Sequence, residues 1–132
     1  MTDELFTIGR MCETFEVTPR TLRFYEQKEL LAPIREGQKR LFTRRDRARL
    51  KLILQGKRFG FSLEEIRQLL NLYDLGDQQV TQISRTYELG QKHLANLIAK
   101  RDELDEAIAE FKTTLKWGEE MLIARGVKKA AE

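Results

Sequence analysis

Two short amphipathic helices are predicted near the N-terminus. Apolar side chains recur there at the i, i+3, i+4 and i+7 spacing of one helix face: Ile8, Met11, Cys12 and Phe15. Thr7 precedes them and can cap the helix. Val17 breaks the pattern, and Thr18 with Pro19 starts a second helix, because threonine caps a helix and proline suits its first position. Two helices joined by a turn of about three residues indicate a helix-turn-helix.

A β-hairpin is predicted next. The second helix ends before Pro33, because the residue before a proline avoids helical geometry. Gly37, between β-branched and aromatic residues, suits a hairpin from Ala32 to Phe42. Its return strand carries Lys39 and Arg40. A helix-turn-helix followed by such a hairpin is a winged arrangement.

Two capping boxes predict two further helices. Thr43 with Asp46 opens the first helix, and Ser62 with Glu65 opens the second. The first is expected to run to about Arg58 and the second to a turn at 74–77. Their expected core residues are Leu50, Ile53, Leu54, Leu63, Ile66, Leu69 and Leu70. Arg44, Arg47 and Lys51 are expected to form a basic stripe on the first of these helices.

Two glycines have specific roles in this region. Gly56 lies inside a predicted helix, where it costs about 1 kcal/mol relative to alanine. We expect it to permit the close approach of another backbone. Gly60 is expected to take the left-handed conformation that ends the helix.

A narrow apolar stripe follows and predicts a coiled coil. Residues alternately three and four apart form the stripe: Val80, Ile83, Tyr87, Gly90, Leu94, Leu97, Arg101, Leu104, Ile108, Phe111 and Leu115. The helix that carries them is about 55 Å long at 1.5 Å per residue. Gly90 and Arg101 interrupt the seam, and both can fix its register. The helix either packs on its own domain or pairs with a second copy, and we favour a homodimer because the preceding region is too small to cover the stripe.

The predicted fold class is therefore mainly α. A winged helix-turn-helix domain occupies 1–76, a coiled-coil dimerisation helix occupies 77–116, and a short tail occupies 117–132. In that tail Trp117, Met121, Leu122 and Ile123 form an apolar cluster that is expected to pack against the partner subunit.

Length and composition agree with a small domain outside the membrane. The chain has 132 residues, enough for one modest core. No apolar run approaches the roughly 20 residues that span a bilayer. The first residues lack the basic-then-apolar order of a secretory signal. A cytoplasmic location and no membrane partner are expected.

Positive charge is concentrated in one segment. The net charge is only +3, but residues 35–58 contain ten lysines and arginines against two acidic residues. Such a cluster is typical of a protein that binds a polyanion. The alternative is an ordinary solvated helix face.

The sequence gives little support to catalysis. His93 is the only histidine, and its flanking heptad position predicts a solvated side chain. Cys12 lies on an apolar helix face, where core packing is expected rather than redox or metal sensing. No catalytic triad, glycine-rich phosphate loop or metal-spaced cluster is present. We therefore expect neither an enzyme nor a metal or other cofactor.

The basic elements suit DNA for different physical reasons. A short helix fits the major groove, where arginine can bind guanine edges, whereas the hairpin and the capped helix can contact phosphates on either side.

The chain resembles the MerR family of transcription regulators. The resemblance is carried by TIG at the first helix, then VTPRTLRFYEQKELL, KRLF, TRRD and GFSLEEIRQLL, and it spans Phe6 to about Tyr73. Within the family, residues 45–74 look like the LiuR-like regulators of branched-chain amino acid and isovalerate breakdown.

This resemblance implies a homodimer that pairs its long helices in antiparallel fashion. It implies binding to, and distortion of, a pseudo-palindromic operator in a promoter used by RNA polymerase, with a small metabolite as a possible class of effector. The DNA-binding residues that it implies are Thr18, Arg20, Thr21, Arg23, Tyr25, Lys39, Arg40, Arg44, Arg45, Lys57 and Arg58.

Departures from the family pattern qualify these expectations. Phe24 and Phe42 stand where many members have tyrosine, so each lacks a phosphate-binding hydroxyl. The paired cysteines of metal-sensing members are absent, which disfavours metal sensing. A large drug-binding domain after Leu115 is not expected either. Two other classes stay open: an architectural DNA-bending protein related to phage excisionases, and a coiled-coil scaffold whose basic domain binds acidic proteins.

Overall fold

The computed structural model describes residues 4–75 and 80–127. Eight elements follow one another along the chain: β1 (Phe6–Thr7), α1 (Ile8–Phe15), α2 (Pro19–Gln27), β2 (Ile34–Glu36), β3 (Lys39–Phe42), α3 (Arg44–Arg58), α4 (Leu63–Leu75) and α5 (Val80–Ala124). The prediction of a mainly α fold with a helix-turn-helix, a hairpin wing and a long C-terminal helix is confirmed. The chain forms two compact units, 1–93 and 94–132.

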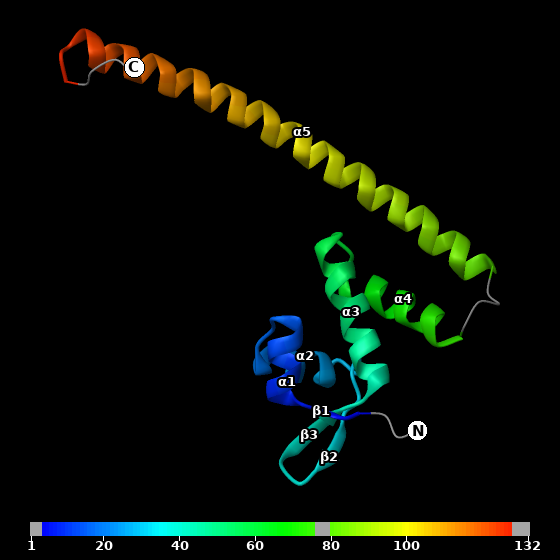
Figure 1. Ribbon diagram of the computed structural model, residues 1–132. Helices are drawn as coiled ribbons and strands as arrows, with labels where there is room; N and C mark the ends of the chain where they lie inside the picture. Colours follow the sequence, from blue (N-terminus) through cyan, green and yellow to red (C-terminus); the bar gives the residue numbers. More distant parts are fainter. Residues whose placement is uncertain (1–3, 76–79, 128–132) are drawn as a thin grey trace. The chain divides into compact units, whose positions relative to one another are not determined.

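The wing belongs to a three-stranded antiparallel sheet in the order β1-β3-β2. β1 was not predicted, because two residues carry no periodicity that sequence reasoning can detect. Phe6 pairs with Phe42, and Thr7 pairs with Leu41. Thr7 then caps α1 by accepting a hydrogen bond from the backbone N–H of Arg10 at 3.2 Å. The sheet lies beside α1 and α3, which both pack against β3 (Figure 1), while β2 forms an outer edge of the sheet.

One apolar core joins α1 to α4 and the sheet. Its buried members are Phe6, Met11, Leu22, Tyr25, Leu30, Leu31, Phe42, Leu50, Ile53, Ile66 and Leu70. Cys12 packs against this core, as predicted. Leu54 and Leu63, which were also expected in the core, are half-buried and pack against it, while Leu69 is half-buried.

The predicted capping boxes form in full. The Thr43 hydroxyl accepts from the Asp46 backbone N–H, and the Asp46 carboxylate accepts from the Thr43 backbone N–H. Asp46 is buried and also accepts from the backbone N–H of Ala32 at 3.0 Å. It therefore ties the start of α3 to the segment that follows α2. Ser62 and Glu65 form the second box at the start of α4.

Gly60 has the predicted positive φ, of 94°. The expectation for Gly56 was wrong in one respect. A Cβ placed on Gly56 would lie 2.8 Å from Cγ1 of Ile66, so the close neighbour is a side chain of α4 and not a backbone. α3 and α4 thus pack closely only because position 56 has no side chain.

The predicted turn at 74–77 is also corrected in part. Asp74 and Leu75 are the last residues of α4, while Gly76 and Asp77 lie outside the described residues. α5 then continues to Ala124, so the segment expected as a tail, 117–132, is helical over its first eight residues. Gly126, with φ of 71°, follows the end of α5, and its N–H donates to the Ile123 carbonyl at 3.0 Å.

Candidate nucleic-acid interface

α2 presents two arginines outward. The Thr18 hydroxyl accepts from the Thr21 backbone N–H at 3.2 Å, so Thr18 caps the helix as predicted. Leu22 and Tyr25 face the core at the helical spacing i, i+3 and are buried. Arg20 and Arg23 consequently lie on the opposite, exposed face. An exposed helix that begins with arginines has the form of a major-groove reader.

Three other residues of α2 differ in their exposure to solvent. Thr21 is half-buried, and its hydroxyl lies 2.9 Å from that of Thr18. Tyr25 is only 1% exposed and belongs to the core, and its contact with DNA stays a prediction. Phe24 is exposed on the same helix, whereas Phe42 is fully buried in β3.

Basic side chains of α2 and the wing converge on one hollow. Arg23, Lys39 and Arg40 line a cavity of about 350 Å³ together with residues at the start of α1. Lys39 is exposed and Arg40 is half-buried. Two elements that are distant in sequence therefore place cations around one space, which suits a polyanion that contacts both.

The wing is joined to α2 by a carboxylate that sequence reasoning missed. Glu26 accepts from Arg35 Nη1 at 3.0 Å and from Arg40 Nε at 2.5 Å. Burial raises the pKa of Glu26, but the hydrogen bonds and charges of Arg40 and Arg35 outweigh it, and the pKa falls below its usual 4.5. No local sequence pattern links residue 26 to residues 35 and 40, because the link depends on how the hairpin packs against α2.

The basic segment at 35–58 separates into structural and exposed members. Arg47 lies over the Phe6 ring, with Cζ 4.1 Å from the centroid, and donates to the Glu4 carbonyl at 2.8 Å. Arg49 is buried and donates to the Leu30 carbonyl at 2.7 Å. The predicted basic stripe is therefore interrupted at Arg47. The predicted contact residues of α3 are exposed: Arg44, Arg45, Lys57 and Arg58.

The prediction that His93 is solvated was wrong. Its ring stacks on Phe61 with centroids 4.6 Å apart, and its Nε2 lies 3.1 Å from Glu65 Oε1. The side chain is only 18% exposed. His93 of α5 contacts Phe61 and Glu65 at the start of α4, and heptad spacing does not encode a contact of this kind.

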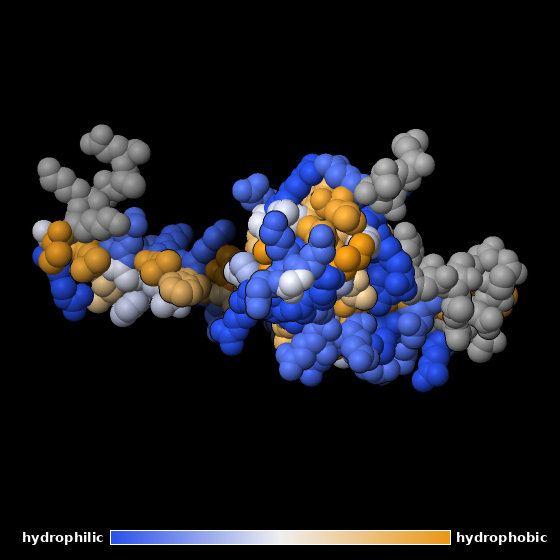
Figure 2. Space-filling view, turned by 90° about the horizontal axis from the view of Figure 1, so that it is seen from below, coloured by the Kyte–Doolittle hydropathy of each residue, from blue (hydrophilic) through white to orange (hydrophobic). Residues whose placement is uncertain are grey.

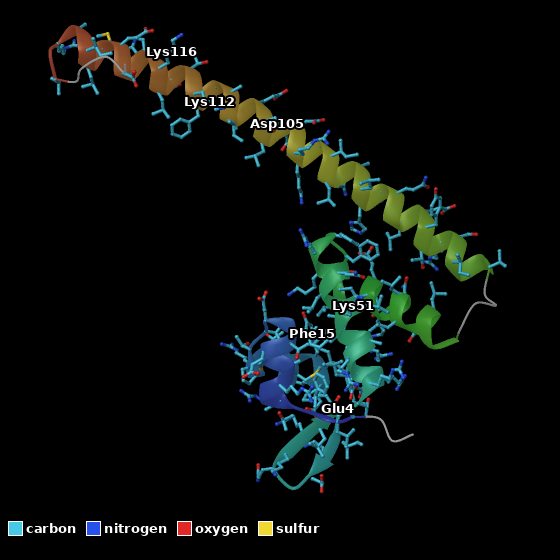
Figure 3. The ribbon with its side chains drawn as sticks, viewed as in Figure 1. Glu4, Phe15, Lys51, Asp105, Lys112 and Lys116 are labelled. Carbon is cyan, nitrogen blue, oxygen red and sulfur yellow. The ribbon has the colours of Figure 1, made fainter. Side chains whose placement is uncertain are left out.

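The apolar seam of α5 is open to solvent within the single chain. Its apolar members range from 37% exposed at Leu97 to 73% at Val80. Arg101 is exposed and pairs with the adjacent Asp102 at 3.2 Å. Hydrophobic side chains appear at several places along the helix (Figure 2), and the side chains of the stretch labelled at Asp105, Lys112 and Lys116 project from it on every side (Figure 3). Trp117 and Leu122 are exposed too, while Met121 and Ile123 are half-buried.

Membrane and metal sites were also considered. Every helix in residues 4–75 and 80–127 is too short or too polar to cross a bilayer. Over the same described residues, no group of three or more histidine, cysteine or acidic side chains could hold a metal ion.

Comparisons with known proteins agree with this architecture. The model of the MerR HTH family regulatory protein matches residues 6–72, and a second model, described as MerR, DNA binding, matches residues 47–113. The chain therefore belongs to the MerR family of helix-turn-helix regulatory proteins. The family consists of DNA-binding transcription regulators and not of enzymes, in agreement with the class predicted from sequence.

Individual relatives support the assignment. The chain is 43% identical over 70 residues to the transcriptional regulator ZntR of Escherichia coli K12, a match that covers 52% of this chain and about half, 50%, of that protein. It is 31% identical over 99 residues to the ZntR homolog of Haemophilus influenzae, covering 74% of this chain and 71% of the relative. Among solved structures, HiNmlR, a MerR family regulator lacking the sensor domain and bound to promoter DNA, has a TM-score of 0.67 at 24% identity, covering 89% of this chain and 94% of that one.

Proposed function

We propose that the chain acts as a homodimer that binds a pseudo-palindromic promoter operator and distorts it to regulate transcription. The observation that carries this proposal is the convergence of Arg23 from α2 with Lys39 and Arg40 from the wing on one cavity. A relative of similar fold, HiNmlR, is bound to promoter DNA.

The contacts are assigned by the position of each element. Arg20 and Arg23, with the N-terminal threonines of α2, contact base edges and adjacent phosphates in the major groove. Lys39 on the wing contacts the flanking backbone. Further phosphate contacts come from four exposed cations of α3, namely Arg44, Arg45, Lys57 and Arg58.

Dimerisation follows from the exposed seam of α5. A helix of 45 residues is about 68 Å long at 1.5 Å per residue and carries apolar side chains along one stripe. Water-exposed apolar area on this scale is stabilised by a partner helix, and the heptad spacing fits a second α5. In this proposal 1–76 binds DNA, 77–116 forms the dimer and 117–132 packs on the partner.

Finer features of the proposal rest on the family resemblance. Distortion of the operator costs on the order of 1–6 kcal/mol, which the paired sets of backbone contacts can offset. RNA polymerase is the proposed functional partner at the promoter. The likeness of residues 45–74 to LiuR-like regulators favours an acyl-CoA or similar metabolite as the effector class.

The excisionase-like alternative shares the winged helix but gives the α5 stripe no role. Selection of bound duplexes from a random-sequence pool by the purified protein distinguishes the two proposals, because it gives the consensus sequence of the binding site. We expect a pseudo-palindromic consensus that is bound by a dimer. A consensus of one half-site bound by a monomer would favour the alternative.

The salt dependence of binding gives a second test. If each subunit neutralises about four phosphates, log K falls with log salt at a slope of about −7. Titrations of the selected duplex at several salt concentrations measure this slope. A slope shallower than about −3 would contradict this number of phosphate contacts.

A further inference from the structure

The wing brings two arginines into direct opposition. Arg35 on β2 and Arg40 on β3 are Cα partners in the antiparallel ladder. Partners of this kind project from the same face of a hairpin with Cβ atoms about 5 Å apart, and like charges in such positions are destabilising. The hairpin therefore needs an anion on that face.

Glu26 of α2 supplies this anion. One carboxylate oxygen, Oε2, accepts from Arg35 Nη1, and the other, Oε1, accepts from Arg40 Nε. The side chains of Glu26 and Arg40 are 21% and 22% exposed, whereas Arg35 is 48% exposed. The bond to Arg40 is thus better shielded from water and is the stronger constraint.

The same helix carries the arginines assigned to base contacts. Glu26 lies three residues after Arg23, and Arg40 lines the cavity that Arg23 and Lys39 share. Glu26 consequently joins the reading helix and the wing at the wall of the interface itself.

We propose that Glu26 is a positioning residue of the DNA interface, which holds the wing against α2 and makes Arg40 a tether rather than a phosphate ligand. Lys39 then remains the phosphate-binding cation of the wing. This inference rests on the proposed function, because it concerns how two DNA-contacting elements are held in register.

The proposal predicts a particular separation of affinities. Sequence-specific binding requires α2 in the groove and the wing on the flanking backbone at the same time, whereas nonspecific binding requires chiefly positive charge. Loss of the Glu26 charge frees the wing and raises the net charge of each subunit by one. Specific binding should weaken while nonspecific binding is maintained or strengthened.

The test compares Glu26→Gln with Glu29→Gln in the full chain. Glu29 is exposed just beyond α2, and its substitution removes the same charge without breaking either wing contact. Affinities are measured for the duplex selected by the wild-type protein and for a random-sequence duplex of equal length. We expect Glu26→Gln to lower the ratio of the two affinities roughly tenfold and Glu29→Gln to leave it unchanged.

A second variant, Arg40→Gln, separates a tether from a phosphate ligand. As a tether, Arg40→Gln should lower the affinity ratio to a similar extent, add little to Glu26→Gln in the double variant, and keep the salt slope of the wild type. A slope that becomes shallower by about 0.9 for each subunit would show a lost phosphate contact and overturn the proposal. Equal affinity ratios for Glu26→Gln and Glu29→Gln would also overturn it.

Two further measurements keep the test decisive. A cooperative unfolding transition in urea shows that Glu26→Gln is folded, and if that variant does not fold, Arg40→Gln provides the same comparison. If the wild-type protein shows no preference for any selected duplex, the proposed function fails. The wing contact is then tested alone by the coupling of Glu26 and Arg40 in a double-mutant cycle on unfolding, where absence of coupling contradicts it.

Discussion

Arg23 and Arg47 show how residues of one type acquire different roles. Arg23 is exposed on α2 and lines the cavity beside the wing. Arg47 covers the Phe6 ring and donates to a backbone carbonyl, so its guanidinium serves the fold. Both are arginines of the basic N-terminal region, and only their surroundings distinguish the arginine that is exposed for the proposed DNA contact from the one that stabilises the fold.

Substitution of Arg23 tests its assignment to base contacts. Arg23→Ala should weaken binding to the selected duplex by about 1–3 kcal/mol and leave binding to random DNA nearly unchanged. Fluorescence anisotropy with the two duplexes measures both affinities. Equal losses on the two would contradict a base-reading role. Lys51→Ala, which removes an exposed cation outside the assigned contact set, is the matched control.

Gly56 is a second residue whose role comes from its neighbour. Alanine at an ordinary helical glycine is stabilising by about 1 kcal/mol. At position 56 the new methyl group would lie 2.8 Å from Ile66 Cγ1 and 3.3 Å from its Cδ1, inside a buried contact. Overpacking of this kind costs about 1–3 kcal/mol, which outweighs the gain in helix propensity.

We therefore expect Gly56→Ala to lower the free energy of unfolding by up to about 2 kcal/mol. Chemical denaturation measures the change. Gly9→Ala is the control, since its Cβ would have only the Thr7 hydroxyl at 4.0 Å, and it should be neutral or stabilising. The Ile66→Ala substitution should cost less in the Gly56→Ala background than in the wild type, and strict additivity would argue against the contact.

At the scale of elements, the sequence reliably predicted the features that depend only on neighbouring residues. Thr7, Thr18, Thr43 and Ser62 all cap helices as predicted, because a cap depends only on residues within one turn. The strand β1 and the partners of Glu26 were missed for the opposite reason. β1 exists only by pairing with β3, and Glu26 meets its arginines across 9 and 14 residues.

The start of α4 shows two elements sharing one carboxylate. Glu65 accepts from the Ser62 backbone N–H at 2.8 Å and meets His93 of α5. The hydrogen bond from Ser62 lowers the pKa of Glu65 below 4.5; partial burial opposes this, and the contact with His93 lowers the pKa further. Folding is therefore linked to the ionisation of this group.

The sign of the pH dependence follows from that lowered pKa. The unfolded chain binds a proton at Glu65 more readily than the folded chain does, so the contribution of Glu65 is complete above pH 4.5 and is lost as the pH falls through the folded pKa. Glu26 contributes in the same direction. We expect Glu65→Gln to reduce stability at pH 7 and to flatten the loss of stability below pH 4.5, as measured by urea unfolding across pH. Glu13→Gln, at an exposed position of α1, serves as the control, and identical profiles for the two variants would contradict the linkage.

At the scale of the whole molecule, the heptad pattern predicted a helix that the structure contains, and the exposed seam is the reason to expect a second copy. Leu97 is the least exposed apolar member of the seam in the single chain, at 37%. A charge at this position would be buried between paired helices without a partner, which is strongly unfavourable.

Leu97→Asp should convert the proposed dimer to monomers. Sedimentation equilibrium measures the mass directly, and Ala99→Asp places the same charge on a different face of α5 as the control. A Leu97→Asp protein that keeps the mass of the wild-type dimer would contradict the assigned seam.

The fold class was accessible from sequence because it depends on local patterns, namely helix periodicity, caps and heptads, whereas the family was indicated by the resemblance of its motifs to those of MerR regulators. The detailed interface was less accessible. Residues 35–58 looked like one continuous basic surface, but Arg35 and Arg40 are held by Glu26 and Arg49 is buried against a carbonyl. Which cations remain available depends on tertiary neighbours that no local pattern specifies.

The bridge from Glu26 to the two wing arginines also limits how this domain can be re-engineered. A chimera that receives only α2 from another regulator would separate the carboxylate from the hairpin selected to fit it. Exchanges intended to transfer operator preference should therefore move residues 19–42 as a single cassette, with helix and hairpin inherited together.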